Sequence, residues 1–231
     1  METKPSQKPD RNPGASGKKS AFCSVLDVVE QIVICLCVVL VLFCFLLRVC
    51  VVSGSSMLPT LRNGQILLVS DLFYQPHAGD IVVFHQTSEN IALYNEPIVK
   101  RVIATEGQTV TIRLTPDEYV ANNRTYTGKK GEIFVDGVLL EETYIQLIDR
   151  WSGTEIGLYQ SQAIPEYNLL TDEDGVQTFE ITLPEGMLFV MGDNRNNSAD
   201  SRTVAIGPVD KRRVLGRVIV QLPLTLPKSA N

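Results

Sequence analysis

Hydrophobic positions divide the chain into two parts with different patterns. An uncharged apolar run, IVICLCVVLVLFCFLL, covers residues 32–47 and continues after Arg48 to Val52. A membrane-spanning helix needs about 20 apolar residues, and this stretch supplies them if the Arg48 side chain reaches the interface. After the run, apolar residues occur in short β-rich segments separated by turn residues. The pattern therefore predicts a transmembrane anchor at residues 26–52 and a mainly β domain at residues 53–231.

Nine segments predict the strands of this domain, because each is rich in β-branched or aromatic residues and lies between turn residues. They are residues 64–70, 79–86, 97–104, 108–114, 131–135, 138–142, 177–183, 187–190 and 214–222. Asp136-Gly137 is a strong signal for a two-residue hairpin. We expect a barrel-like or folded-sheet fold with residues 113–183 as an inserted β subdomain. The polar stretches 115–130 and 150–176 are expected to be loops, and Trp151 in the second to be structural.

The residues before the apolar run predict how the anchor is oriented. Residues 1–25 form a polar tail that we expect to be disordered and cytoplasmic. It carries basic residues, which favour a cytosolic N-terminus and an extracytoplasmic main domain, although Arg48 weakens this bias. The alternative is a cleaved secretory signal peptide, with Ser53-Gly54-Ser55 imitating a cleavage site. The length of the apolar run and Glu30 before it favour a retained anchor.

Composition excludes several kinds of chemistry. The net charge of −5 leaves no electrostatic footprint for nucleic acid. All five cysteines lie in the first fifty residues, which excludes a cysteine nucleophile, a thiolate metal site and a disulfide framework from the main domain. His77 and His85 are the only histidines, and neither belongs to a recognisable metal or triad motif. No metal or organic cofactor is implied.

Three polar stretches remain as candidates for catalysis. Ser56 lies in the sequence SGSSMLPTL directly after the apolar run, and Lys100 lies between apolar residues of a predicted strand. The third stretch, GDNRNNSADSR, covers residues 192–202; it lacks the spacing and the final glutamate of a calcium-binding EF-hand. A lysine activates a serine only when it is neutral, so its pKa has to fall from about 10.4 by roughly 2–3 pH units. Burial among apolar side chains produces changes of that size.

Four motifs resemble those of bacterial type I signal peptidases, especially the short single-anchor form of Gram-positive bacteria. They occur in the order known for that family and lie behind the apolar run. They are Ser56-Met57-Leu58-Pro59-Thr60-Leu61, Gly79-Asp80-Ile81-Val82-Val83-Phe84, Lys100-Arg101-Val102-Ile103-Ala104 and residues 192–202. The resemblance covers about residues 30–222 and is weakest across 113–183.

The resemblance implies a role for each matched residue. Ser56 corresponds to the nucleophile and Lys100 to the general base. Supporting residues would be a hydroxyl that orients the lysine, an ion pair and two structural residues: Ser198, Asp200 with Arg202, and Asp193 with Arg195. Shallow pockets for small substrate side chains would be lined by Val52, Met57, Leu61 and Val99. The backbone N–H of Ser56 would stabilise the oxyanion, whereas Gly54 stands where some members carry a second hydroxyl donor. The Gly-Asp pair that follows the lysine motif in the family is Gly107-Gln108 here.

The resemblance implies an enzyme that removes signal peptides from exported preproteins through an acyl-enzyme. It would act as a monomer at the cell membrane, in contact with lipid. One alternative is a self-cleaving repressor-type protease, which also uses a serine and a lysine, but it would be soluble and carry a DNA-binding domain. A second alternative is a membrane-anchored binding or adhesion domain without catalysis.

Overall fold

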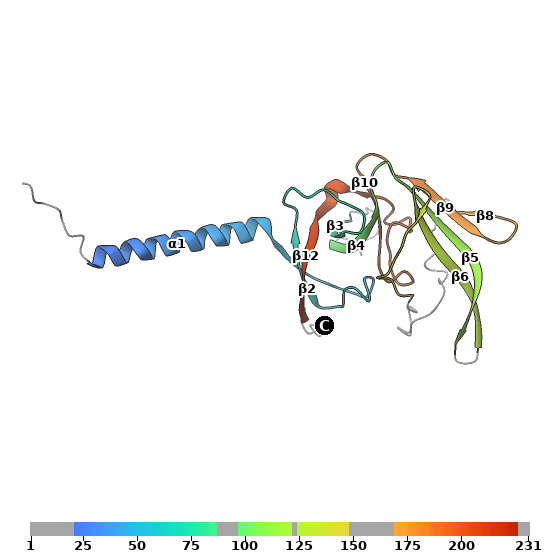
Figure 1. Ribbon diagram of the computed structural model, residues 1–231, viewed down its shortest axis with the longest axis horizontal. Helices are drawn as coiled ribbons and strands as arrows, with labels where there is room; N and C mark the ends of the chain where they lie inside the picture. The colour runs from blue at the N-terminus through green and yellow to red at the C-terminus, as the bar shows by residue number, and fades with distance from the viewer. Residues whose placement is uncertain (1–20, 87–96, 122–123, 148–168, 226–231) are drawn as a thin grey trace, which may run out of the picture. The chain divides into compact units, whose positions relative to one another are not determined.

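The computed structural model describes residues 21–86, 97–121, 124–147 and 169–225 (Figure 1). Residues 1–44 and residues 45–231 form two compact units. The predictions for residues 1–20 of the tail and for Trp151 lie outside the described residues. The prediction that residues 21–25 belong to a disordered tail was wrong, because a helix begins at Ala21. The mainly β prediction is confirmed, because strands account for most of the described part of the larger unit.

Helix α1 spans Ala21–Leu46, and its side chains from residue 25 to residue 41 are exposed. Among the described residues, no helix reaches the length and apolar character required to cross a membrane. Our prediction that the helix continues to Val52 was wrong, because Arg48–Val51 form strand β1. A continuous apolar run does not separate a helix from a strand, and the β-branched valines at its end fit an extended backbone.

The first sheet has seven strands in the order β1-β2-β12-β3-β4-β10-β11. Besides β1, its strands are β2 (Gln65–Ser70), β3 (Ile81–His85), β4 (Pro97–Ala104), β10 (Met187–Met191), β11 (Val209–Asp210) and β12 (Val214–Thr225). Their pairing is antiparallel. A short 3-10 helix, Lys211–Arg213, lies between the last two strands. The strand order does not close on itself, so the structure supports folded sheets and not a closed barrel.

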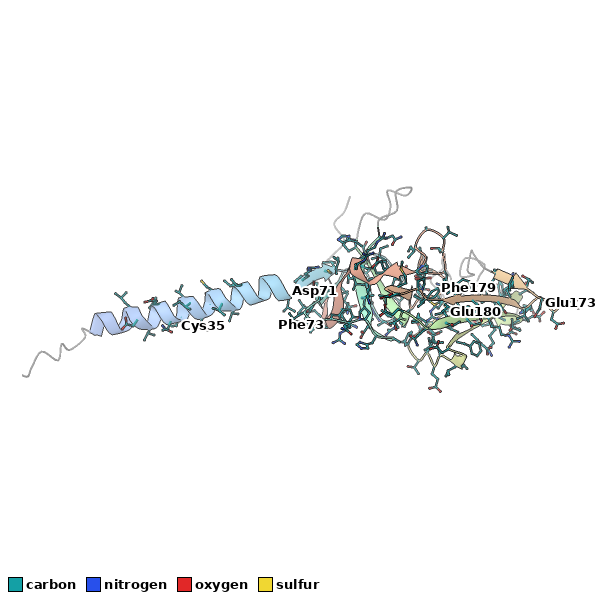
Figure 2. All side chains as sticks on the ribbon, turned by 90° about the horizontal axis from the view of Figure 1, so that it is seen from above. Cys35, Asp71, Phe73, Glu173, Phe179 and Glu180 are labelled. Carbon is teal, nitrogen blue, oxygen red and sulfur yellow. The ribbon has the colours of Figure 1, made fainter. Side chains whose placement is uncertain are left out.

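The second sheet has five strands in the order β7-β6-β5-β9-β8. They are β5 (Thr109–Ala121), β6 (Arg124–Val135), β7 (Val138–Leu139), β8 (Leu169–Thr171) and β9 (Gln177–Thr182). Successive residues of β9 face opposite sides: Phe179 is buried, and Glu180 is exposed (Figure 2). The sheet begins at Thr109, four residues before the expected boundary, and both sheets belong to the same compact unit.

Two details of the second sheet differ from the prediction. Residues 115–121 and 124–130 are strands and not loops, because the pairing of β5 with β6 continues from Thr115–Lys130 to Ala121–Arg124. Its polar residues suit a strand because backbone hydrogen bonds hold the ladder and exposed positions need no apolar side chain. The expected strand 138–142 is only two residues long. Within the expected loop 150–176, residues 169–171 are β8, and residues 150–168 lie outside the described part.

Three clusters of buried apolar side chains stabilise the larger unit. Strand β4 contributes to each of them: Val99 borders one, Val102 belongs to the second, and Ile103 belongs to the third. The third cluster also contains side chains of β5 and β9, so it joins the two sheets. Lys100 therefore lies on the strand that connects all three cores.

Candidate active site

Ser56 and Lys100 lie in direct contact, although 43 residues separate them in the chain. The Nζ atom of Lys100 is 2.8 Å from Oγ of Ser56 and 3.0 Å from the carbonyl oxygen of Val99, to which it donates. Ser56 lies in the turn after β1, and Lys100 lies in the middle of β4. Only 3% of Lys100 is exposed. These distances fit a neutral amine that donates one hydrogen to the carbonyl and accepts one from the serine hydroxyl.

The surroundings of Lys100 disfavour its charged form. Burial lowers the pKa of the Lys100 amine to about 8, and the positive charge of Arg202 acts in the same direction. Asp200 and Asp193 oppose the decrease by attracting the charge, but neither accepts a hydrogen bond from Nζ. At a pKa of about 8, roughly half of the amine is neutral at pH 8 and about a tenth at pH 7.

The loop after β10 holds the backbone around Ser56. The backbone N–H of Asn194 donates to the carbonyl oxygen of Ser56 at 3.0 Å. The Asn194 side chain donates to the Ser55 carbonyl at 3.1 Å, and the Asn197 side chain donates to Ser55 Oγ at 2.8 Å. The loop therefore fixes the peptide groups on either side of the candidate nucleophile.

Gly192 allows this loop to approach Ser56 closely. A Cβ atom at this position would collide with the Ser56 carbonyl oxygen and with the side chain of Ser198. Glycine is the residue that permits such a backbone approach. Sequence reasoning placed Gly192 in a motif but gave it no role.

Ser198 lies beside Gly192 but does not contact Lys100 through a hydrogen bond. Its Oγ is buried, and no described residue forms a hydrogen bond of ordinary geometry with it. The hydroxyl nevertheless helps to lower the pKa of Asp200. The orienting role that the resemblance implied for Ser198 therefore stays a prediction.

Asp200 and Arg202 form a buried, bidentate ion pair. Nε and one terminal nitrogen of Arg202 donate to the two carboxylate oxygens of Asp200, each at 2.8 Å. Asp200 also accepts the backbone N–H of Gly192 at 2.9 Å. Burial opposes ionisation, but the Arg202 charge and these hydrogen bonds lower the pKa of Asp200 overall. The pair thus holds both ends of the loop together.

Asp193 and Arg195 bind partners that the sequence did not indicate. Arg101 donates to both oxygens of Asp193, at 2.9 Å and 2.6 Å, and the Thr60 hydroxyl donates to the same carboxylate. Arg195 pairs with Glu142, which follows β7. Sequence reasoning missed Thr60 and Glu142, because no spacing rule connects residues that lie so far apart in the chain.

The four residues expected to select the substrate lie in one place, but three of them, Val52, Met57 and Leu61, offer little surface. Val52, Met57 and Leu61 belong to one buried cluster, and Val99 packs against it. Met57 is 1% exposed and Leu61 is 0% exposed, whereas Val99 is half-buried. Of the four, Val99 is therefore the side chain most able to touch a substrate in this conformation.

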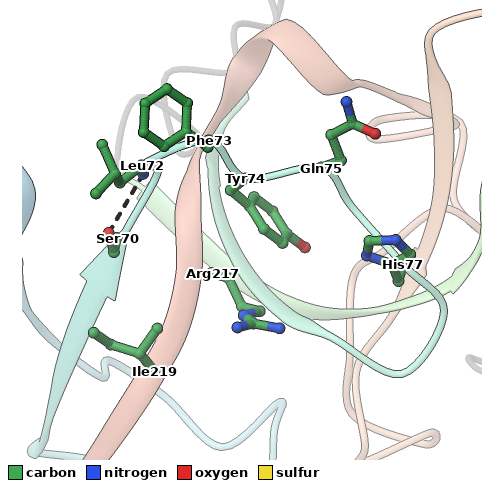
Figure 3. A pocket seen from close by; sticks show the side chains of 8 residues that line it. All are labelled: Ser70, Leu72, Phe73, Tyr74, Gln75, His77, Arg217 and Ile219. Atoms are coloured by element: carbon green, nitrogen blue, oxygen red, sulfur yellow. Dashed lines mark hydrogen bonds between the residues drawn. The ribbon is translucent and has the colours of Figure 1, made fainter.

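A separate cleft of about 260 Å³ has a different lining (Figure 3). Its residues come from the end of β2, from the segment after it and from β12: Ser70, Leu72, Phe73, Tyr74, Gln75, His77, Arg217 and Ile219. None of them is a candidate site residue, and the exposed His77 is the only candidate for histidine chemistry among them. Within the described residues, no group of histidine, cysteine and carboxylate side chains is arranged to hold a metal ion.

A serine hydroxyl in contact with a buried amine of lowered pKa is an arrangement suited to a serine hydrolase without a histidine base. The signal peptidase family, peptidase S26, matches residues 25–222 of the chain. A signal peptidase I of Leptolyngbya laminosa is 30% identical over 222 residues, covering 93% of this chain and 87% of that protein.

Two further relatives agree with this match. A probable signal peptidase I-1 of Synechocystis sp. is 32% identical over 174 residues, which cover 73% of this chain and 67% of the relative. A signal peptidase I of Bacillus licheniformis is 30% identical over 196 residues, which cover 84% and 86%. The chain belongs to the signal peptidase family, peptidase S26. The prediction of a signal peptidase I is confirmed, and a self-cleaving repressor is not supported.

Proposed function

We propose that this signal peptidase is a membrane-bound serine endopeptidase that uses Ser56 as nucleophile and Lys100 as general base. The observation that supports the proposal is the 2.8 Å contact between Oγ and a buried Nζ that makes no hydrogen bond to a carboxylate. A neutral amine in this position can take the hydroxyl proton as the oxygen attacks.

The reaction proceeds in two stages. Lys100 accepts the proton of Ser56 while Oγ attacks the substrate carbonyl carbon. The resulting ammonium then gives a proton to the leaving amine as the peptide bond breaks, which leaves an ester on Ser56. Neutral again, Lys100 takes a proton from a water molecule that attacks the ester, and it returns that proton to Oγ. The signal peptide leaves with a free carboxyl group.

The negative charge on the attacked oxygen needs a hydrogen-bond donor. We assign the backbone N–H of Ser56 to this role. Gly54 has no side chain to offer, and the Ser55 side chain is held at Asn197, whose amide donates to the Ser55 hydroxyl oxygen. Fixing of the Ser56 backbone by Asn194 keeps this N–H in place.

The substrate binds as an added strand. Strand β4 pairs with β3 from Pro97 to Arg101, but with β10 only from Arg101 onward. Residues 97–100 thus have a strand neighbour on only one side among the described strands, and β1 is the edge of its sheet. An extended preprotein segment can complete such an edge through backbone hydrogen bonds. The half-buried Val99 beside it favours small side chains near the cut.

Helix α1 anchors the enzyme in the membrane, with the N-terminus in the cytosol and the larger unit outside. This part of the proposal is supported by the uncharged apolar run at residues 32–47 and by the basic residues before it. The partners are then signal-peptide-bearing preproteins and membrane lipid. We expect a monomer to suffice, because Ser56 and Lys100 both come from one chain.

Cleavage of a preprotein by the full-length protein in detergent tests the two central roles. Ser56→Ala and Lys100→Ala should each lower kcat/KM by about 10⁴-fold or more, as expected when one member of a coupled catalytic pair is removed. Lys130→Ala, which changes a lysine that is 61% exposed, is the control and should cleave normally. Full cleavage by both active-site variants would leave only a binding role, and activity in Lys100→Ala alone would place the base elsewhere.

A further inference from the structure

Two side chains of the segment that follows β7, those of Glu142 and Tyr144, contact residues next to the candidate dyad. Glu142 and Tyr144 alternate with exposed residues, Glu141 and Thr143. Glu142 is 9% exposed at its side chain, and Tyr144 is partly buried. Both contact arginines that belong to the two motifs around the candidate dyad.

Glu142 binds Arg195 through both carboxylate oxygens. One terminal nitrogen of Arg195 donates to Oε2 at 2.6 Å, and the other donates to Oε1. The Arg195 side chain is completely buried. Two parallel hydrogen bonds fix the orientation of the guanidinium group as well as its position.

Arg195 transmits this restraint to the backbone that surrounds the nucleophile. Its Nε donates to the carbonyl oxygen of Gly192 at 3.1 Å. Gly192 packs directly against the Ser56 carbonyl group, which also accepts the backbone N–H of Asn194. Glu142 is thus connected to Ser56 indirectly: it binds the Arg195 side chain, which binds the Gly192 carbonyl, and Gly192 packs against Ser56.

Tyr144 supports the same arrangement from the lysine side. Its hydroxyl donates to Oε1 of Glu142 at 2.8 Å, and Cζ of Arg101 lies 3.9 Å from the centre of its ring. Arg101 follows Lys100 in the chain and holds Asp193. The two side chains therefore restrain both neighbours of the dyad, one on β4 and one on the loop.

We infer that Glu142 is a positioning residue for the cleavage reaction, and that Tyr144 assists it. By holding Arg195, Glu142 keeps the Gly192–Asn194 turn against the Ser56 peptide, so that Oγ stays in line with Nζ of Lys100. The inference rests on the proposed Ser56–Lys100 mechanism. The segment after β7, which contains none of the four motifs, then helps to position the residues that carry out the reaction.

Glu142→Gln, assayed with the full-length protein in detergent, tests this positioning. We expect kcat for preprotein cleavage to fall about 10- to 100-fold while KM changes less than about twofold, because the substrate edge is untouched. Glu142→Asp should recover part of the loss, since it keeps the charge but is one methylene shorter. Glu141→Gln makes the same chemical change at an exposed neighbour and should equal the wild type.

Loss of folding has to be separated from loss of positioning, because Glu142→Gln removes a carboxylate charge that contacts the buried Arg195. The double variant Glu142→Gln/Arg195→Met removes both charges together with the link to Gly192. It should be folded by circular dichroism and still show the reduced kcat. A folded double variant with wild-type kcat would overturn the inference.

A measurement without substrate separates this inference from the proposed function. Backbone hydrogen exchange at residues 192–197, followed by mass spectrometry, should be faster in Glu142→Gln than in Glu141→Gln. Equal exchange in the two variants would contradict the positioning role even if both cleave the preprotein. If the wild type fails to cleave, the proposed function fails, while the exchange comparison still decides whether Glu142 holds the turn.

Discussion

Lys100 and Arg202 are both buried cations close to the same loop, but their surroundings differ. Arg202 is 1% exposed and shares two hydrogen bonds with the Asp200 carboxylate. Lys100 is 3% exposed and contacts only a hydroxyl and a carbonyl oxygen. A buried charge normally needs an ionic partner, because removing it from water is costly.

The difference separates stabilisation from catalysis. The ion pair gives the Arg202 charge a buried partner and holds the loop, so its burial serves the structure. Burial destabilises the charged form of Lys100, to which no carboxylate among the described residues is hydrogen-bonded, and it yields an amine that can accept a proton near neutral pH. Substitutions in the Asp200–Arg202 pair and at Lys100 test whether the charge of each site stabilises or destabilises the folded protein.

Asp200→Asn should have the largest effect on stability. It removes the carboxylate charge that Arg202 contacts through two hydrogen bonds, and breaking such a buried pair typically costs about 3–5 kcal/mol of the free energy of unfolding. Urea denaturation of the full-length protein in detergent, followed by circular dichroism, measures the change. A loss below about 1 kcal/mol would show that water or another group compensates Arg202, and the contrast with Lys100 would disappear.

Lys100→Met should act in the opposite direction, although it abolishes cleavage. The folded-state pKa of about 8 lies below the ordinary value of 10.5, so the folded state disfavours the charged amine. This penalty is fully present below pH 8 and disappears as the pH rises from about 8 to 10.5. The variant should therefore be more stable than the wild type by about 3 kcal/mol at pH 7, and the advantage should disappear above about pH 10.5.

The same denaturation experiment at several pH values tests this sign. A variant less stable than the wild type at pH 7 would mean that Lys100 is well solvated or paired. The control is Lys130→Met, which should show no pH-dependent difference, because that side chain is 61% exposed.

The pH dependence of cleavage should follow the Lys100 amine. Activity requires the neutral form, so kcat/KM should decrease about tenfold between pH 9 and pH 7, with an apparent pKa of about 8. Initial rates on a preprotein between pH 6 and pH 10 measure the profile. A profile that is flat down to pH 6 would show that another group, or a more strongly depressed amine, acts as the base.

Asp71→Asn should have the smallest effect. Its ion pair with Arg48 spans 3.2 Å, but the two side chains are 46% and 49% exposed. Such surface pairs contribute about 0–1 kcal/mol, so stability should change by less than about 0.5 kcal/mol and cleavage should stay normal. A larger loss of stability or of cleavage would mean that the Arg48–Asp71 ion pair supports the active site as the buried ion pairs do.

Strands could be predicted where apolar side chains alternate with polar ones or form a continuous run. They were harder to predict where the side chains are polar and backbone hydrogen bonds alone form the strand. The segments 64–70 and 97–104 correspond to β2 and β4 almost residue for residue. The outer part of the β5–β6 hairpin was missed because its exposed positions are polar. Strand β1 was missed because its valines continue an apolar run that ends a helix.

The motifs predicted the main residues of the candidate site, but they did not predict all of the contacts between them. The pairing of Asp200 with Arg202 was implied by the resemblance, and the structure contains it. The contacts of Asp193 with Arg101 and of Arg195 with Glu142 join residues 92 and 53 positions apart, which no local pattern encodes. The need for Gly192 likewise depends on a close approach that only the folded chain creates.

Because β4 contributes to all three hydrophobic clusters, packing in each of them affects the surroundings of Lys100. The lowered pKa of the amine therefore depends on packing across the larger unit. Substitutions far from the cleavage site, in any of the three cores, can shift the working pH of the enzyme. A stabilising repacking of those cores is a route to tuning the protease without altering a residue that touches its substrate.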